Sequence, residues 1–182
     1  MQLSTRALPQ PNSLARNIAL IVAASILVAL AAQVSIPVPF SPVPFTLQDL
    51  AVLLVGLTLG GRRGAAALVL YLTEGAVGLP VFSPAAGPSG IAHLIGPTGG
   101  YLLAYPLVAY VAGTVWIPVR RSFGRALVST TLAQLALFTF GVVWLGVYTH
   151  SLSHAFAVGA LPFLPFAAAK VVLASTTQVR RS

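Results

Sequence analysis

Long runs of apolar residues dominate the chain and predict membrane-spanning helices. Six runs are bounded by proline, glycine, arginine or polar clusters, at residues 18–36, 47–60, 65–79, 99–119, 126–148 and 165–179. A helix needs about 20 residues to cross about 30 Å of hydrocarbon. The second, third and sixth runs are shorter, which indicates broken helices lining a cavity. We therefore predict an all-α integral membrane protein, with one domain over residues 1–182 that forms a six-transmembrane-helix bundle.

Positive charges alternate between the connections and predict an orientation. The first, third and fifth connections contain no Lys or Arg. The N-terminus, the second and fourth connections and the C-terminus carry Arg16, Arg62, Arg63, Arg120, Arg121, Arg125, Arg180 and Arg181. Under the positive-inside rule, both termini are cytoplasmic and the uncharged connections face outward. We expect a multi-pass protein of the cytoplasmic cell membrane.

Composition excludes several classes of protein. Hydrophobic residues make up 57% of the chain and charged residues 7%, against roughly 25% charged residues in soluble domains. The net charge of +8 comes from cations that lie between the apolar runs and are not gathered into a patch with aromatic residues. This distribution predicts a lipid bilayer, and not a nucleic acid, as partner. Without cysteine, the chain has no disulfide, thiolate metal site or thiol nucleophile.

The uncharged connections are rich in proline. Residues 35–45 contain four prolines, and residues 81–98 combine prolines with glycines. Proline restricts the backbone at little further entropic cost, so we predict ordered outer loops 1 and 3. In the alternative interpretation, proline and glycine only terminate helices.

Three charged residues lie within or at the edge of the apolar runs, namely Asp49, Glu74 and Lys170. Charges at this depth are costly and usually face a cavity or a partner. Lys170 either donates to a ligand carboxylate or carbonyl, or forms an ion pair with Glu74 or Asp49. Glu74 has the same two interpretations. For Asp49 we favour a structural role, because the helix dipole stabilises an acid in the first turn of a helix.

The segment Gly96-Pro97-Thr98-Gly99-Gly100-Tyr101 concentrates residues with special backbone properties. Its glycines permit close approach of backbone to a ligand, and helix N-terminal amides after Thr98 are suitable donors. No lysine follows the glycines, so this segment is not a nucleotide-binding phosphate loop.

Histidines give little support to catalysis. His150 and His154 have the i,i+4 spacing of a metal-binding helix face, but no third ligand is near in sequence, which favours a solvated interfacial pair. His93 alone in the third connection indicates little. We predict no catalytic site, metal or cofactor. A membrane-embedded hydrolase or metal enzyme, and a proton-coupled secondary carrier of a small carboxylate that uses Glu74, are the alternatives.

Small residues recur on one face of the first run. Ala15, Ala19 and Ala23 are spaced by four, and small side chains at this spacing let another helix approach closely. The approaching helix belongs either to a partner protein or to the same bundle.

Three motifs resemble those of a known family. They are Val-Pro-Phe-Thr-Leu-Gln at 43–48, Leu-Pro-Val-Phe at 79–82 and Gly-Pro-Thr-Gly-Gly-Tyr-Leu at 96–102. With them the chain resembles, from about residue 18 to 170, the BioY family of biotin-specific substrate-binding (S) subunits of energy-coupling-factor (ECF) transporters. The resemblance implies import of biotin, a pocket near the outer face closed by loops 1 and 3, and partners comprising a transmembrane coupling subunit and two ATPases. It also implies that the alanine face docks on the coupling subunit.

The motifs and the embedded charges together suggest a set of substrate-binding residues. These are Phe45, Thr46, Gln48, Glu74, Phe82, Gly96, Pro97, Thr98, Gly99, Gly100, Tyr101 and Lys170. The chain departs from the family at the last run, where Pro-Gly-Asp-x-x-Lys is usual and Ala167 stands at the acid's position. The resemblance implies that this acid binds the ureido N–H groups of biotin. Either Glu74 or Asp49 takes its place, or affinity and specificity have shifted.

Overall fold

The structure is a computed structural model that describes residues 13–87, 89–114 and 123–179. Helices dominate these ranges, and each of the six apolar runs overlaps one of them; residues 115–119 of the fourth run lie outside the described residues. In chain order the elements are α1 (Ser13–Gln33), β1 (Ser35–Val38), β2 (Ser41–Thr46), α2 (Gln48–Leu59), α3 (Gly61–Ala76), η1 (Pro84–Ala86), α4 (Ile91–Ile95), α5 (Gly99–Thr114), α6 (Phe123–Thr149), α7 (Leu152–Gly159), η2 (Leu161–Phe163) and α8 (Leu164–Val179). The predicted all-α class is confirmed. Arg120, Arg121, Arg180 and Arg181 lie outside the described residues.

The bundle combines long and short helices. Three described segments are long and apolar enough to cross a membrane, at Leu14–Gln33, Phe123–Thr149 and Leu152–Thr177. By contrast, α2 has 12 described residues and α3 and α5 have 16 each. These short helices form much of the interior. Of the three shorter runs expected to border a cavity, the second and sixth form α2 and α8, which supply cavity-lining residues, whereas α3, from the third run, supplies none. The count of six spans and the orientation of the termini stay predictions.

The connection between α2 and α3 is shorter than the sequence predicts. Only Gly60 separates the two helices, with φ at 80°, a left-handed value that favours glycine. Arg62 and Arg63 therefore lie in the first turn of α3 and not in a loop, and both are exposed.

The predicted loop 1 is a β-hairpin. Strands β1 and β2 pair antiparallel, with Ser35 opposite Thr46 and Val38 opposite Ser41, and the register shifts between Ile36 and Val38. Both strands of this two-stranded sheet are edge strands. A proline whose missing N–H would point away from the partner strand breaks no hydrogen bond of the sheet, so prolines are tolerated. The loop is thus ordered, as predicted, but its regular structure was not expected.

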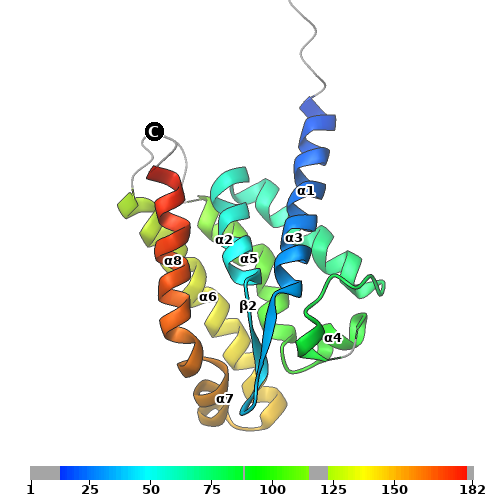
Figure 1. The fold of residues 1–182 in the computed structure, drawn as a ribbon, viewed down its shortest axis with the longest axis vertical. Coiled ribbons are helices and arrows are strands. Elements are labelled where there is room, and N and C mark those ends of the chain that lie inside the picture. The colour runs from blue at the N-terminus through cyan, green and yellow to red at the C-terminus, as the bar shows by residue number, and fades with distance from the viewer. Residues whose placement is uncertain (1–12, 88, 115–122, 180–182) are drawn as a thin grey trace, which may run out of the picture.

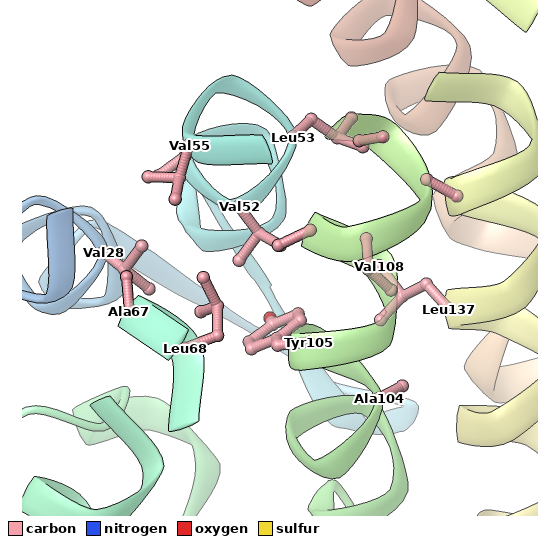
Figure 2. Close-up of a cluster of buried hydrophobic side chains, with 14 of the residues drawn as sticks. Val28, Val52, Leu53, Val55, Ala67, Leu68, Ala104, Tyr105, Val108 and Leu137 are labelled. Carbon is pink, nitrogen blue, oxygen red and sulfur yellow. The ribbon is translucent and has the colours of Figure 1, made fainter. Parts of the chain in front are cut away.

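The core lies where α2, α3 and α5 meet, with contributions from α1 and α6 (Figure 2). Helix α5 packs against α2, α3 and α6. Backbones approach closely here: a Cβ on Gly56 would lie 2.5 Å from the carbonyl oxygen of Ala109, and one on Gly113 would lie 2.6 Å from the carbonyl carbon of Gly60. Only glycine fits at such contacts.

The bundle has two different ends (Figure 1). The hairpin, α4 and α7 gather at one end, which we call the cavity end, and β2 packs there against both α7 and η1. Because α1, α3 and α6 each run toward that end, their first turns lie at the other. This arginine end carries the exposed Arg16, Arg62, Arg63 and Arg125.

Candidate functional site

A cavity of about 580 Å³, counting the part open to solvent, lies at the cavity end. Its polar lining consists of Thr46, Gln48, Asp49, Ser83, His93, Thr98, Tyr101, Tyr105 and Lys170. Its remaining lining consists of Val43, Pro44, Ala86, Leu102, Leu137, Gly159 and Phe163. An apolar enclosure with convergent polar groups is the usual form of a binding site.

An ion pair forms one side of the cavity. Lys170 Nζ on α8 donates to Asp49 Oδ1 on α2 at 2.6 Å and to the carbonyl oxygen of Thr46 at 2.6 Å. The Lys170 and Asp49 side chains are 16% and 14% exposed, so each keeps some surface toward the cavity. An ammonium has three donors and a carboxylate several acceptor positions. The pair can therefore receive a neutral group that carries both an N–H and a C=O.

A buried hydrogen-bond chain supports this side of the site. Gln48 Nε2 donates to the Tyr71 hydroxyl at 2.7 Å, and that hydroxyl donates to the carbonyl oxygen of Val81 at 3.1 Å. The chain connects the start of α2, next to Asp49, to α3 and to the third connection. Because Gln48 is 2% exposed, these contacts fix the first turn of α2.

The other side of the cavity consists of the third connection and the start of α5. Ser83, His93 and Thr98 are buried and line it. Trp144 Nε1 on α6 donates to the carbonyl oxygen of Gly96 at 2.8 Å, which anchors the segment before α5. The Tyr101 hydroxyl donates to the carbonyl oxygen of Gly159 at 2.8 Å, which ties α5 to the end of α7.

Side-chain contacts attach the hairpin to its neighbours. Ser41 Oγ donates to the carbonyl oxygen of Val158 on α7 at 2.7 Å. The Phe45 ring lies 4.5 Å from the Phe163 ring and 4.6 Å from the Phe166 ring, centroid to centroid. Phe163 lines the cavity, so the hairpin closes this side through an aromatic cluster.

The structure brings together only part of the predicted substrate-binding set. Thr46, Gln48, Thr98, Tyr101 and Lys170 line the cavity. The others lie outside its lining: Phe45, Glu74, Phe82, Gly96, Pro97, Gly99 and Gly100. Among these, Phe45 lies behind Phe163, and Phe82 packs edge-on against Tyr71 with centroids 5.5 Å apart.

Gly99 and Gly100 of the 96–101 segment lie against neighbouring helices, and their approach to a ligand stays a prediction. A Cβ on Gly100 would lie 2.8 Å from the carbonyl oxygen of Phe140, and one on Gly99 would lie 2.8 Å from the carbonyl carbon of Leu94. Both glycines are buried. They let α5 lie close to α6 and to the end of α4.

Glu74 joins two helices away from the cavity. Its Oε2 accepts a hydrogen bond from Ser25 Oγ, which lies on α1 and is fully buried. The expected alternatives for Lys170 included Glu74 or Asp49 as partner, and the structure has Asp49. Asp49 therefore lies in the cavity, in addition to occupying the first turn of α2.

His150 and His154 do not share one helix face. His150 follows α6 with φ at 55°, and His154 lies within α7. Both are exposed. The chain turns between them, so the i,i+4 geometry that a metal would require is not formed. No group of three or more His, Cys, Asp and Glu among the described residues is arranged for a metal ion.

The alanine face of α1 points away from the bundle. Ala15, Ala19 and Ala23 are all exposed, whereas Val28 and Ala32 on another face of α1 are fully buried. Internal packing thus uses a different face, and the small residues are left free for contacts outside the described bundle.

Several cavity residues carry no signal in the sequence. Ser83, Tyr105, Leu137 and Phe163 are single residues in unremarkable contexts, and packing between distant segments brings them together. His93 offered the one available signal, as an isolated histidine between two apolar runs.

The fold and site define a class: a multi-pass membrane protein whose short inner helices and ordered loops enclose a cavity at one end. Comparisons with known proteins specify the family. The BioY family matches residues 3–181. The probable biotin transporter BioY of Pyrococcus horikoshii is 37% identical over 150 residues, covering 82% of this chain and 86% of the relative. The biotin transporter BioY of Thermotoga maritima is 39% identical over 145 residues, covering 80% and 84%. The chain belongs to the BioY family.

A solved structure supports the fold. The crystal structure of the S-component for biotin from an ECF-type ABC transporter superposes with a TM-score of 0.84, at 22% identity, over 96% of both chains. This likeness establishes the helical arrangement.

Proposed function

We propose that this chain captures biotin as the substrate-binding S component of an ECF transporter and takes part in its import across the cytoplasmic membrane. The observation that carries the proposal is the Asp49–Lys170 pair in the cavity of a BioY-family chain. Relatives with 37% and 39% identity are named biotin transporters.

The cavity matches the chemistry of biotin. The ureido ring presents N–H donors beside a carbonyl acceptor, so Asp49 accepts from an N–H while Lys170 donates to the carbonyl. The apolar lining of Val43, Leu137 and Phe163 suits the fused ring and the aliphatic tail. Ala167 is 5% exposed on α8, and Asp49 supplies from α2 the carboxylate that the family usually has there.

Capture of this kind makes and breaks no covalent bond, so the chain acts as a transport protein and not as an enzyme. The energy for import comes from partners, which we propose to be a transmembrane coupling subunit and two ATPases. The exposed alanine face of α1 is the docking surface, since small residues permit close approach of a second helix in the bilayer.

Binding of labelled biotin to the purified subunit tests the proposal. Wild type should bind saturably, and Lys170→Met should bind about 10- to 150-fold more weakly, because a charge-assisted hydrogen bond contributes about 1.5–3 kcal/mol. Glu74→Gln is the matched control, since Glu74 lies outside the cavity lining, and should bind as wild type does. Absence of saturable binding by wild type would refute the proposed substrate.

A double variant separates binding from folding. Lys170→Met leaves Asp49 without its partner and should lower the ligand-free melting temperature. Adding Asp49→Asn should restore melting but not affinity. If melting and affinity both returned, Lys170 would serve the fold and not the ligand.

A further inference from the structure

A buried pair of hydroxyl groups joins α6 to α8 beneath the cavity. The hydroxyl oxygens of Thr130 and Ser175 lie 3.1 Å apart, so that one hydroxyl can donate to the other. Both side chains are fully buried. Thr130 precedes the cavity-lining Leu137 on α6, which runs toward the cavity end. Ser175 follows Lys170 on α8, which runs away from that end. Neither hydroxyl belongs to the cavity lining, so the pair lies on its arginine side and touches no solute in it.

Helix α8 has a buried stripe with Lys170 at one edge and Ser175 at the other. The spacing from residue 170 to residue 175 corresponds to a rotation of about 140° around the axis of an α-helix. The buried residues of this stripe between the two edges are Ala167, Val171 and Ala174. Helix α8 packs against α2 and α6 (Figure 1). Lys170 attaches one edge to α2 through Asp49. Ser175 attaches the other edge to α6 through Thr130.

The apolar part of this stripe defines the rotation of α8 poorly. Alanine and valine present small, smooth surfaces, and apolar side chains of membrane helices gain little by leaving lipid. A hydrogen bond is directional and weakens steeply when its two groups are displaced. A rotation or slide of α8 would separate Thr130 from Ser175 and would move Lys170 Nζ relative to Asp49. The hydroxyl pair therefore resists the movements that would misplace the cation.

We propose that Thr130 and Ser175 are positioning residues for solute capture. Their hydrogen bond sets the rotation of α8 and thereby keeps Lys170 directed at Asp49 and the cavity before a solute arrives. This inference rests on the proposed function, because it concerns how the proposed solute-binding cation is held. It gives two residues that touch no solute a role in affinity.

The pair can be broken without leaving a buried hydroxyl unpaired. Thr130 Oγ1 also lies 2.7 Å from the carbonyl oxygen of Ala126, and Ser175 Oγ lies 2.7 Å from that of Val171. In Ser175→Ala, the hydroxyl of Thr130 donates to its own helix, and in Thr130→Val the hydroxyl of Ser175 does the same. Both variants should therefore fold and insert, which a melting curve in detergent checks.

Binding of labelled biotin to Thr130→Val, Ser175→Ala and the double variant tests the role of the bond. Each should bind about 3- to 15-fold more weakly than wild type, as expected for one hydrogen bond between membrane helices. The double variant should bind as weakly as either single variant, because the same bond is lost in all three. Ser129→Ala is the matched control and should bind as wild type does. Ser129 is a buried serine on α6 whose hydroxyl donates to the carbonyl oxygen of Ala126.

A variant of Lys170 distinguishes positioning from general support of the fold. In Lys170→Met, which lacks the cation, adding Thr130→Val should cause no further loss of affinity. A merely structural role would reduce affinity by the same factor in both backgrounds. That result, or wild-type affinity in both Thr130→Val and Ser175→Ala, would overturn the positioning role and leave the proposed function intact. Failure of wild type to bind labelled biotin would overturn the proposed function and this inference with it.

Discussion

The arginine end and the cavity end of the bundle are held together by different contacts. At the arginine end, Gly56, Gly60 and Gly113 bring backbones within van der Waals distance. At the cavity end, Gly99 and Gly100 also let α5 lie close to its neighbours, but the hairpin is attached by side chains: Ser41 donates to the backbone of α7, and the Phe45 ring packs on the Phe163 ring. Helices whose backbones are in contact cannot move closer together, whereas side-chain contacts can rearrange when a ligand enters. The comparison suggests a rigid base beneath a cover that responds to the solute.

The largest effect is expected from adding one methyl group at the arginine end. Gly113→Ala places a Cβ 2.6 Å from the carbonyl carbon of Gly60 and 2.7 Å from the carbonyl oxygen of Gly56. Overpacking of this kind costs about 1–3 kcal/mol and can cost more, and backbone cannot rotate away as a side chain can. We expect a sharp fall in the melting temperature measured in detergent.

The control for this variant is Gly124→Ala. Gly124 is exposed in the first turn of α6, where alanine is favoured over glycine by up to about 1 kcal/mol. This change should leave melting unaltered or raise it slightly. Equal melting of the two variants would contradict a close-packed arginine end.

A smaller effect, confined to the ligand, is expected at the cavity end. Phe45→Ala removes two ring contacts, to Phe163 and Phe166, and each aromatic pair contributes about 0.5–1.5 kcal/mol. The hairpin should then open more readily, and bound biotin should dissociate roughly 5- to 150-fold faster. Dissociation of labelled biotin after dilution measures this rate.

Phe40→Ala separates hairpin closure from general loss of apolar surface. Phe40 lies at the turn of the same hairpin and is 65% exposed, so its removal should change the dissociation rate little. If both variants released biotin equally fast, the aromatic cluster would not hold the cover.

The arginine end was easier to predict from the sequence than the cavity end. Apolar runs must become helices in hydrocarbon, because every backbone group needs an internal partner, and most of the described part of each run is helical. The hairpin was missed because proline is usually depleted in strands. The packing of Gly99 and Gly100 against α4 and α6 was not predicted either, since a sequence shows that glycine permits close approach but not which neighbour approaches.

The same limit applies to the candidate site. Lys170 and Gln48 were predicted because a charge in an apolar run and a family motif are local signals. Ser83, Tyr105 and Leu137 come from three separate elements, and only the folded arrangement makes them neighbours. The partner of Lys170 was likewise undecided, because Asp49 and Glu74 both carry a carboxylate and only the packing of α8 on α2 selects one.

The smallest effect on the isolated chain is expected on the outer face of α1, near the arginine end. Ala19 is exposed on a rigid helix, so Ala19→Leu should change melting by less than about 0.5 kcal/mol, as for other surface changes, and should leave biotin affinity unaltered. It should nevertheless reduce association with the coupling subunit, because the added bulk separates helices that small residues bring together. Co-purification of the tagged subunit with the coupling subunit measures association, and labelled biotin measures binding.

Ala168→Leu is the control and should associate normally. Ala168 is exposed on α8, a helix that Figure 1 places on the other side of the bundle from α1. If the two variants associated equally well with the coupling subunit, the docking surface would not be on α1. If Ala19→Leu lost biotin binding, this face of α1 would support the cavity itself.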